Sequence, residues 1–228
     1  PRILKVRKEL TQKILKNPPD AFIGIDAPDF NLKLEEKLKH KGIKTIHVVS
    51  PSFWAWRKNR VKVLSQSVDL LLCLFPFEES LLKEHNVNAV FIGHPLADSI
   101  QQKIDLQAAR NNSELKAKIV VALMPGSRSS EIKRHAKLFL EAAKLLTKKL
   151  EDIEFVIPVV DSKIGEQLKK ILDQYLTDLK VTITDSAHSA LSVSDLVITK
   201  SGTSTLEAAL HKKPMVVVYK MSSLSYWF

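Results

Sequence analysis

The stretch KIVVALMPGSRSSEIKRHAKLFLEAAKLL, Lys118 to Leu146, passes from one kind of secondary structure to another within a few residues. Residues 118–126 form a short apolar run that predicts a buried strand, and apolar residues at helical spacing predict a helix over 131–150. A Pro-Gly pair marks the turn between them. A strand followed directly by a helix is the repeating unit of a parallel, doubly wound sheet.

The same alternation continues on both sides of this stretch. The other strands are predicted over residues 21–26, 45–50, 68–75, 88–93, 153–159, 180–184, 195–200 and 214–219, and the other helices over 3–15, 31–40, 163–175 and 203–211. We therefore predict an α/β fold with two Rossmann-like domains, whose ligands bind at the carboxyl ends of the strands.

A polar segment, DSIQQKIDLQAARNNSEL (98–115), separates the two sets of strands. It has no clear apolar period, which is typical of a connection between domains. We predict a first domain over 1–97, a linker over 98–115 and a second domain over 116–228. The first residue is not Met and the last residues are apolar, so we expect both domains to be partial.

The composition is that of a globular protein with a positive surface. Of 228 residues 45% are hydrophobic, and most of the net charge of +10 comes from residues 1–60, which hold 14 Lys and Arg against 6 Asp and Glu. Such a surface attracts nucleic acid, anionic lipid or phosphorylated small molecules. The longest apolar run, near 70–77, is too short to span a membrane. The lone Cys73 excludes an internal disulfide and fits a reducing cytoplasm.

A carboxylate ends the first predicted strand, in AFIGIDAPDF (21–30). Asp26 would stand at the carboxyl edge of the sheet, where it could act as a general base. One of the two acids in this stretch is expected to cap the next helix. Asp29 is the better cap because it directly precedes the helical pattern, which leaves Asp26 for chemistry.

Two further loops join a strand end to a helix start. In MPGSR (124–128), the amides at the start of a helix suit an anion and Arg128 adds a fork of donors. An ordinary turn with a serine as the helix cap explains the same residues equally well. The SGTSTLE loop (201–207) has the same design. There Glu207 could reach ribose hydroxyls, but Ser204 and Glu207 also match a capping box.

Neither loop has the G-x-G-x-x-G or Walker A pattern, which disfavours dinucleotide and P-loop chemistry. The sequence also holds no recognisable cluster of metal ligands, and we predict neither a metal nor a cofactor.

With these loops in place, the chain resembles the lipid-A-disaccharide synthases, glycosyltransferases of the GT-B fold, in which two Rossmann-like domains face each other across a cleft. The resemblance covers nearly the whole length. It is carried by six motifs in the family's order and approximate spacing, namely GIDAPDFN (24–31), KTIHVVSPSFWAWRKNRV (44–61), FPFE (75–78), FIGH (91–94), MPGSR (124–128) and SGTSTLE (201–207).

The resemblance implies transfer of a sugar from UDP-2,3-diacylglucosamine to the 6-hydroxyl of 2,3-diacylglucosamine 1-phosphate (lipid X), giving the β-1,6 lipid A disaccharide 1-phosphate and UDP. Inversion in one displacement needs a base for the acceptor and positive groups for the leaving UDP. Asp26 is the expected base, Glu207 is expected to orient the ribose, and His94 is expected either to line the cleft or to stabilise its own turn. The residues expected to bind the diphosphate are Gly126, Ser127, Arg128, Ser201, Gly202 and Thr203.

The segment PSFWAWRKNR (51–60) places aromatic residues beside cations. Both implied substrates carry acyl chains, and aromatic and cationic side chains suit the headgroup layer of a membrane. We therefore expect an acceptor-binding or membrane-facing surface and a peripheral location on the cytoplasmic face of the inner membrane. Burial of the tryptophans in the domain core is the alternative. The residues concerned are Phe53, Trp54, Trp56, Arg57 and Arg60.

The nearest rival is another UDP-sugar transferase of the same fold, such as the one that adds N-acetylglucosamine to a peptidoglycan precursor. The motifs GIDAPDFN and SPSFWAWRKNR favour the lipid A reading. Nucleic-acid binding is suggested by a pI near 9.6, but the sequence lacks aromatic-and-basic RNA motifs, and we expect no nucleic-acid partner. The oligomeric state is not predicted. From the resemblance, we expect the family's amino-terminal strand with its Gly-rich loop and its carboxyl-terminal segment to be missing from this sequence.

Overall fold

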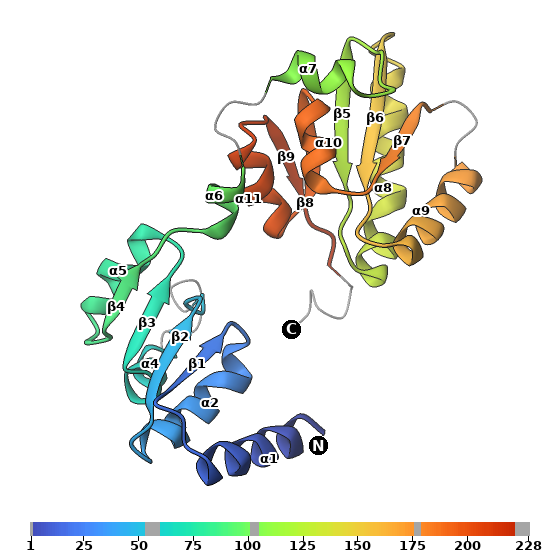
Figure 1. The fold of residues 1–228 in the computed structure, drawn as a ribbon. Coiled ribbons are helices and arrows are strands. Elements are labelled where there is room, and N and C mark those ends of the chain that lie inside the picture. The colour runs from blue at the N-terminus through green and yellow to red at the C-terminus, as the bar shows by residue number, and fades with distance from the viewer. Residues whose placement is uncertain (1, 53–59, 101–104, 176–178, 222–228) are drawn as a thin grey trace. The chain divides into compact units, whose positions relative to one another are not determined.

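The computed structural model describes residues 2–52, 60–100, 105–175 and 179–221 (Figure 1). The chain divides into two compact units, Pro1–Ala97 and Asp98–Phe228. Each unit contains one sheet, and every strand pairing in both sheets is parallel.

The first sheet has the order β1-β2-β3-β4. Its strands are β1 (Ala21–Ile25), β2 (Lys44–Val48), β3 (Leu70–Cys73) and β4 (Ala89–Phe91). The helices of this part of the chain are α1 (Arg2–Lys16), α2 (Pro28–Lys39), α4 (Arg60–Ser67), α5 (Pro76–Lys83) and α6 (Pro95–Ser99). Strand order therefore follows chain order, as successive right-handed crossovers on one side of a sheet produce.

The two faces of the first sheet differ. On one face, Leu71 of β3 packs with Leu64 of α4 and Leu82 of α5, and all three are fully buried. On the other face, Ile23 and Ile25 of β1 are 56% and 67% exposed. Successive side chains of a strand point to opposite faces of the sheet, so residues on the covered face alternate with residues on the exposed face.

The second sheet has the order β7-β6-β5-β8-β9. Its strands are β5 (Ile119–Met124), β6 (Ile153–Pro158), β7 (Val181–Thr184), β8 (Leu196–Lys200) and β9 (Met215–Val218). Its helices are α7 (Leu106–Asn111), α8 (Ser129–Thr147), α9 (Ser162–Tyr175), α10 (Ala187–Val193) and α11 (Thr203–Leu210). The order reverses at β5, and this reversal is where doubly wound sheets bind their ligands.

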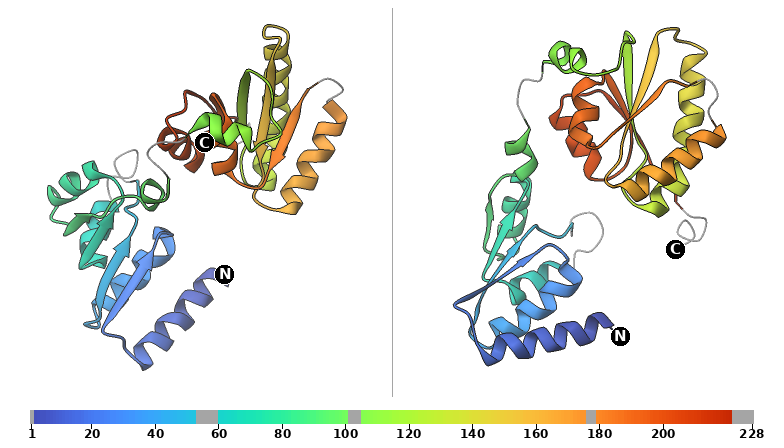
Figure 2. Two further views of the ribbon diagram at one scale, coloured as in Figure 1. Left: turned by 45° about the horizontal axis from the view of Figure 1, so that its top comes forward. Right: turned by 45° about the vertical axis from the view of Figure 1, so that its right-hand side comes forward.

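Helices cover both faces of the second sheet (Figure 2). Val121 and Leu123 of β5 pack with Phe139 of α8 and other buried residues of α8 and α9. The intervening Val120 and Ala122 face α10 and α11. The near-continuous apolar run of β5 is thus buried on both sides, and the predicted α/β fold with Rossmann-like units is confirmed.

Part of the segment expected to be a linker is helical. Residues 106–111 form α7, whose Asp105 cap accepts a hydrogen bond from the amide of Ala108 at 3.0 Å. Arg110 donates from Nε to the carbonyl of Val193 at 3.0 Å and pairs with Asp195. The sequence did not predict this helix because it has no apolar period. Hydrogen bonds and an ion pair, not a buried apolar face, attach it to the rest of the unit.

Candidate functional site

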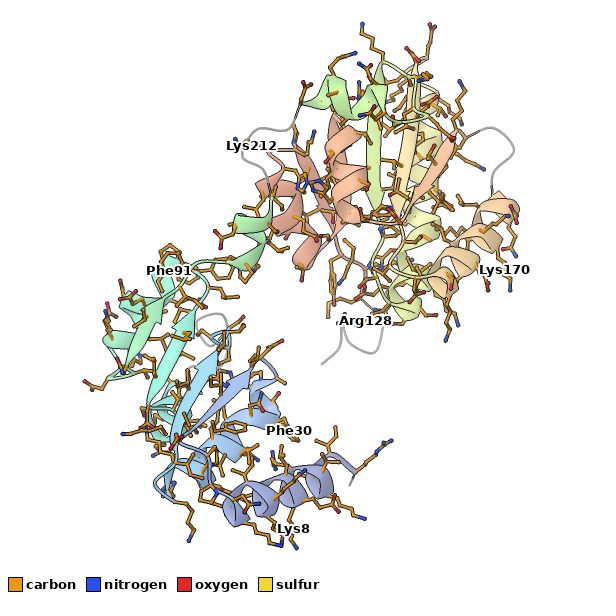
Figure 3. The ribbon with its side chains drawn as sticks, viewed as in Figure 1. Lys8, Phe30, Phe91, Arg128, Lys170 and Lys212 are labelled. Atoms are coloured by element: carbon orange, nitrogen blue, oxygen red, sulfur yellow. The ribbon has the colours of Figure 1, made fainter. Side chains whose placement is uncertain are left out.

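The carboxyl ends of the strands of the second unit surround a cavity of about 350 Å³. Figure 3 labels Arg128 at this end of the sheet. The loop after β6 contributes Val159 and Val160, and the loop after β7 contributes Asp185 and Ser186. The cavity is also lined by six residues expected from the sequence to bind the donor, namely Gly126, Ser127, Arg128, Gly202, Thr203 and Glu207.

The MPGSR loop is closed by a carboxylate that the sequence analysis missed. Glu131, at the third position of α8, accepts hydrogen bonds from the amides of Ser127 at 3.0 Å and Arg128 at 3.3 Å. Glu131 therefore occupies these two amides in the structure, and diphosphate binding by the MPGSR loop stays a prediction. The alternative of a serine at the helix cap is wrong, because α8 begins at Ser129 with Arg128 in the cap position. A Glu at the third helical position was the available signal.

Glu131 also binds the two cations of the cavity. Its Oε1 lies 3.1 Å from Nη1 of Arg128 and 3.1 Å from Nζ of Lys200. Burial opposes ionisation of this carboxyl, but the hydrogen bonds from Lys200, Ser127 and Arg128 outweigh burial and lower the pKa of Glu131 to about 2. The side chain of Arg128 is 78% exposed, so its guanidinium can turn toward a ligand.

The SGTSTLE loop begins α11 with Gly202 in the cap position. Ser204 lies within the first turn of α11 and not at its cap, so Ser204 and Glu207 do not form a capping box. The hydroxyl of Ser204 is instead hydrogen-bonded to that of Thr199 at 2.8 Å. The amide of Ser201 donates to the carbonyl of Val218 at 2.9 Å and belongs to the sheet. The first backbone amides of a helix have no partner within the helix. In α11 these are the amides of Thr203 and Ser204, two residues that line the cavity.

Glu207 lies one turn into α11 and lines the cavity. Burial raises the pKa of its carboxyl. Glu207 does not form the capping box, and its contact with the hydroxyl groups of a ligand stays a prediction.

In the first unit, Asp26 follows β1 in a tight turn. Asp26 and Ala27 both have left-handed backbones, with φ of 51° and 45°. Nδ2 of Asn31 donates to the carbonyl of Asp26 at 2.8 Å, and the amide of Asp26 donates to the carbonyl of Val48 at 2.9 Å. Non-glycine residues in this conformation are strained and cluster at functional sites. Ala27 rather than Asp29 is the helix cap, and the side chain of Asp26 is exposed.

A buried ionisable pair lies directly beneath this turn. Nδ1 of His47 is 2.8 and 3.1 Å from the two carboxylate oxygens of Glu35, and both side chains are fully buried. Gly24, two residues before Asp26, leaves room for Glu35, since a Cβ there would lie 2.0 Å from its Oε1. A polar residue within the apolar strand TIHVVS was the sequence signal for this pair.

Glu78 of the FPFE motif is buried at the carboxyl end of the first sheet. It accepts a hydrogen bond from the amide of Phe75 at 3.0 Å. Burial raises the pKa of Glu78, against hydrogen bonds from Phe75, Leu74 and Ser50. Glu78 thereby joins the start of α5 to Ser50, the residue before PSFWAWRKNR.

Most of PSFWAWRKNR lies outside the described residues. The expected surface residues Phe53, Trp54, Trp56 and Arg57 belong to the part that the structure leaves out, and only the backbone of Arg60 is described, at the start of α4. Their roles stay predictions.

His94 makes the turn-stabilising contact that the sequence left open. Its Nδ1 accepts a hydrogen bond from the amide of Leu96 at 3.2 Å, and its ring lies 6.0 Å from that of Phe75. Its role in lining a cleft stays a prediction. Within the described ranges, no helix has the length and apolarity to cross a membrane, and no three His, Cys, Asp or Glu side chains form a group that could hold a metal ion.

Comparison with known proteins assigns the chain to a family. Residues 1–228 match the family model described as lipid-A-disaccharide synthetase. Relatives named lipid-A-disaccharide synthase include one from Pseudomonas putida (strain W619), 48% identical over 226 residues, and one from Methylobacillus flagellatus, 44% identical over 231 residues. Each alignment covers 99% of this chain but 60% and 61% of the relatives, so the chain spans about 60% of their length.

Solved structures share the fold at low sequence identity. The S. aureus MnaA–UDP co-structure has a TM-score of 0.65 at 16% identity, covering 96% of this chain and 64% of that chain. The crystal structure of Acinetobacter baumannii MurG has a TM-score of 0.55 at 16% identity, covering 98% and 59%. These likenesses show the GT-B fold alone. The family model, which matches the whole sequence, shows that the chain belongs to the lipid-A-disaccharide synthetase family.

Proposed function

We propose that the whole protein transfers 2,3-diacylglucosamine from its UDP derivative to the 6-hydroxyl of lipid X, and releases UDP. The observation that carries this proposal is the cavity at the strand ends of the second unit. It is lined by residues of the MPGSR loop, Arg128 among them, and by residues of the SGTSTLE loop. Membership of the lipid-A-disaccharide synthetase family supports the choice of sugar and acceptor.

The second unit binds the donor in this proposal. The guanidinium of Arg128 and the first amides of α11 stabilise the diphosphate, which gains negative charge as it leaves. Glu207 accepts hydrogen bonds from the ribose hydroxyls. The loops after β6 and β7 line another part of the cavity. In this proposal they hold the uracil ring.

The first unit supplies the base. Asp26 takes the proton of the acceptor 6-hydroxyl, whose oxygen forms a bond to the anomeric carbon on the face opposite the diphosphate. The bond between that carbon and the diphosphate oxygen breaks, and UDP leaves with the electron pair. The strained turn after β1 fixes the backbone of Asp26, which limits the positions its carboxylate can take.

We also propose that the protein works at the cytoplasmic face of the inner membrane. Both substrates carry acyl chains, and the aromatic and cationic residues of PSFWAWRKNR suit contact with the headgroup layer or with the acceptor.

The experiment that tests the proposal compares two acceptors with the full-length protein and purified UDP-2,3-diacylglucosamine. Lipid X should be converted to the disaccharide, detected by mass, whereas a lipid-linked peptidoglycan precursor offered with UDP-N-acetylglucosamine should not react. The reverse preference would replace the proposal with the rival transferase.

A further inference from the structure

Lys200 is a cation of the donor cavity to which nothing above assigns a function. It is the last residue of β8, and its side chain is 16% exposed. Its Nζ lies 3.1 Å from Oε1 of Glu131, the carboxylate that closes the MPGSR loop. A Cβ built on Gly202 would lie 3.3 Å from the same nitrogen. The ammonium group therefore lies beside the carboxylate that closes the MPGSR loop and beside the start of the SGTSTLE loop.

This position is the one that a diphosphate held by both loops would approach. An ammonium there is largely removed from water, where its attraction for an anion is stronger than at an exposed site. Lys200 also lies 5.9 Å above the ring of Tyr219, a contact that keeps the side chain over the loop.

Glu131 does not need Lys200 in order to remain satisfied. Its carboxylate accepts from the backbone amides of Ser127 and Arg128, and these two donors remain when the ammonium moves away. A lysine side chain has a flexible four-carbon stem and three donors, so it can turn a donor toward a second anion at low cost.

We propose that Lys200 is a further donor-binding residue, whose ammonium pairs with Glu131 in the unliganded cavity and binds a diphosphate oxygen when the UDP-sugar enters. This inference rests on the proposed function, because it requires a diphosphate ligand. Glu131 holds the ammonium at the cavity and is a positioning residue. If the ion pair were only structural, it would join β8 to α8 without contacting the ligand.

The test measures binding of UDP and of uridine to the full-length protein by calorimetry. Lys200→Met should weaken UDP binding about tenfold to a hundredfold, the range for a charge-assisted hydrogen bond, and should leave uridine binding unchanged. Lys200→Arg should recover most of the UDP affinity. Lys170→Met removes the same charge from an exposed position on α9, outside the cavity, and should bind UDP like the unsubstituted protein (Figure 3).

Three results would overturn the inference. Equal UDP affinity of Lys200→Met and the unsubstituted protein would show that the ammonium does not contact the diphosphate. Equal weakening of UDP and uridine, with a lower melting temperature, would show a structural role. Failure of the unsubstituted protein to bind UDP would overturn the proposed function together with this inference. The other two results differ from it because in both of them the unsubstituted protein binds UDP.

Discussion

Substitution of Gly24 by Ala tests the packing beneath the candidate base. The added Cβ would lie 2.0 Å from Oε1 of Glu35, whereas real Cβ contacts are essentially never shorter than 3.0 Å. The carboxylate must therefore move by about 1 Å. It cannot move into solvent, because Glu35 is fully buried and bonded to His47 at 2.8 Å.

The expected loss of stability follows from this geometry. Leaving a buried charge without its partner costs about 3 to 5 kcal/mol, and overpacking by one methyl group costs about 1 to 3 kcal/mol. Partial retention of the Glu35–His47 bond lowers the total, and we expect a loss of about 3 kcal/mol. At about 4 to 8 °C for each kcal/mol in a domain of this size, the first domain should melt about 12 to 24 °C lower.

Scanning calorimetry of the full-length protein measures this shift. Gly165→Ala is the matched control, since its Cβ would make an ordinary contact at 3.7 Å with Val159 and the residue lies within α9. It should leave the melting temperature unchanged or raise it slightly. In a double-mutant cycle, Gly24→Ala should cost almost nothing once Glu35→Ala has removed the carboxylate. A full and additive cost in both backgrounds, or no cost in either, would refute the steric argument.

Three further predictions concern the site residues. Asp26→Asn should lower turnover about 10²-fold to 10⁴-fold while UDP binding by calorimetry stays within about twofold, as expected for loss of a general base; unchanged turnover would remove Asp26 from the mechanism. Arg128→Ala should weaken UDP binding about tenfold without lowering the melting temperature, because the side chain is 78% exposed; unaltered donor affinity would contradict that assignment. Since the pKa of Glu131 is lowered from 4.5 to about 2 in the folded state, its stabilising effect is complete above about pH 4.5 and disappears as the pH falls toward 2. Glu131→Gln should flatten that part of an acid-unfolding curve followed by circular dichroism, and an identical curve would show that the carboxylate is not held as described.

The strands could be predicted from the sequence because their apolar runs are short and sharply bounded. The run over 153–159 became β6 at Ile153–Pro158, and the run over 195–200 became β8 at Leu196–Lys200. The helices α4, α5 and α10, with seven or eight residues each, were not predicted. Two turns give too few apolar repeats for a period, so packing against the sheet decides such helices.

The candidate site could be predicted only in part. The two loop motifs identified residues that line one cavity, because parallel strands bring their carboxyl ends to the same edge. The use of individual amides could not be predicted. Glu131 occupies two of them and β9 occupies that of Ser201, since these bonds depend on side chains and strands distant in the sequence. Lys200 gave no signal beyond its position at a strand end.

The most direct test of the proposed function is the product formed by the full-length protein from UDP-2,3-diacylglucosamine and lipid X. We predict one β-1,6-linked disaccharide 1-phosphate for each UDP released, with mass identifying the product and NMR its anomeric configuration. Release of UDP without the disaccharide, or an α-linked product, would contradict an in-line displacement by the acceptor hydroxyl.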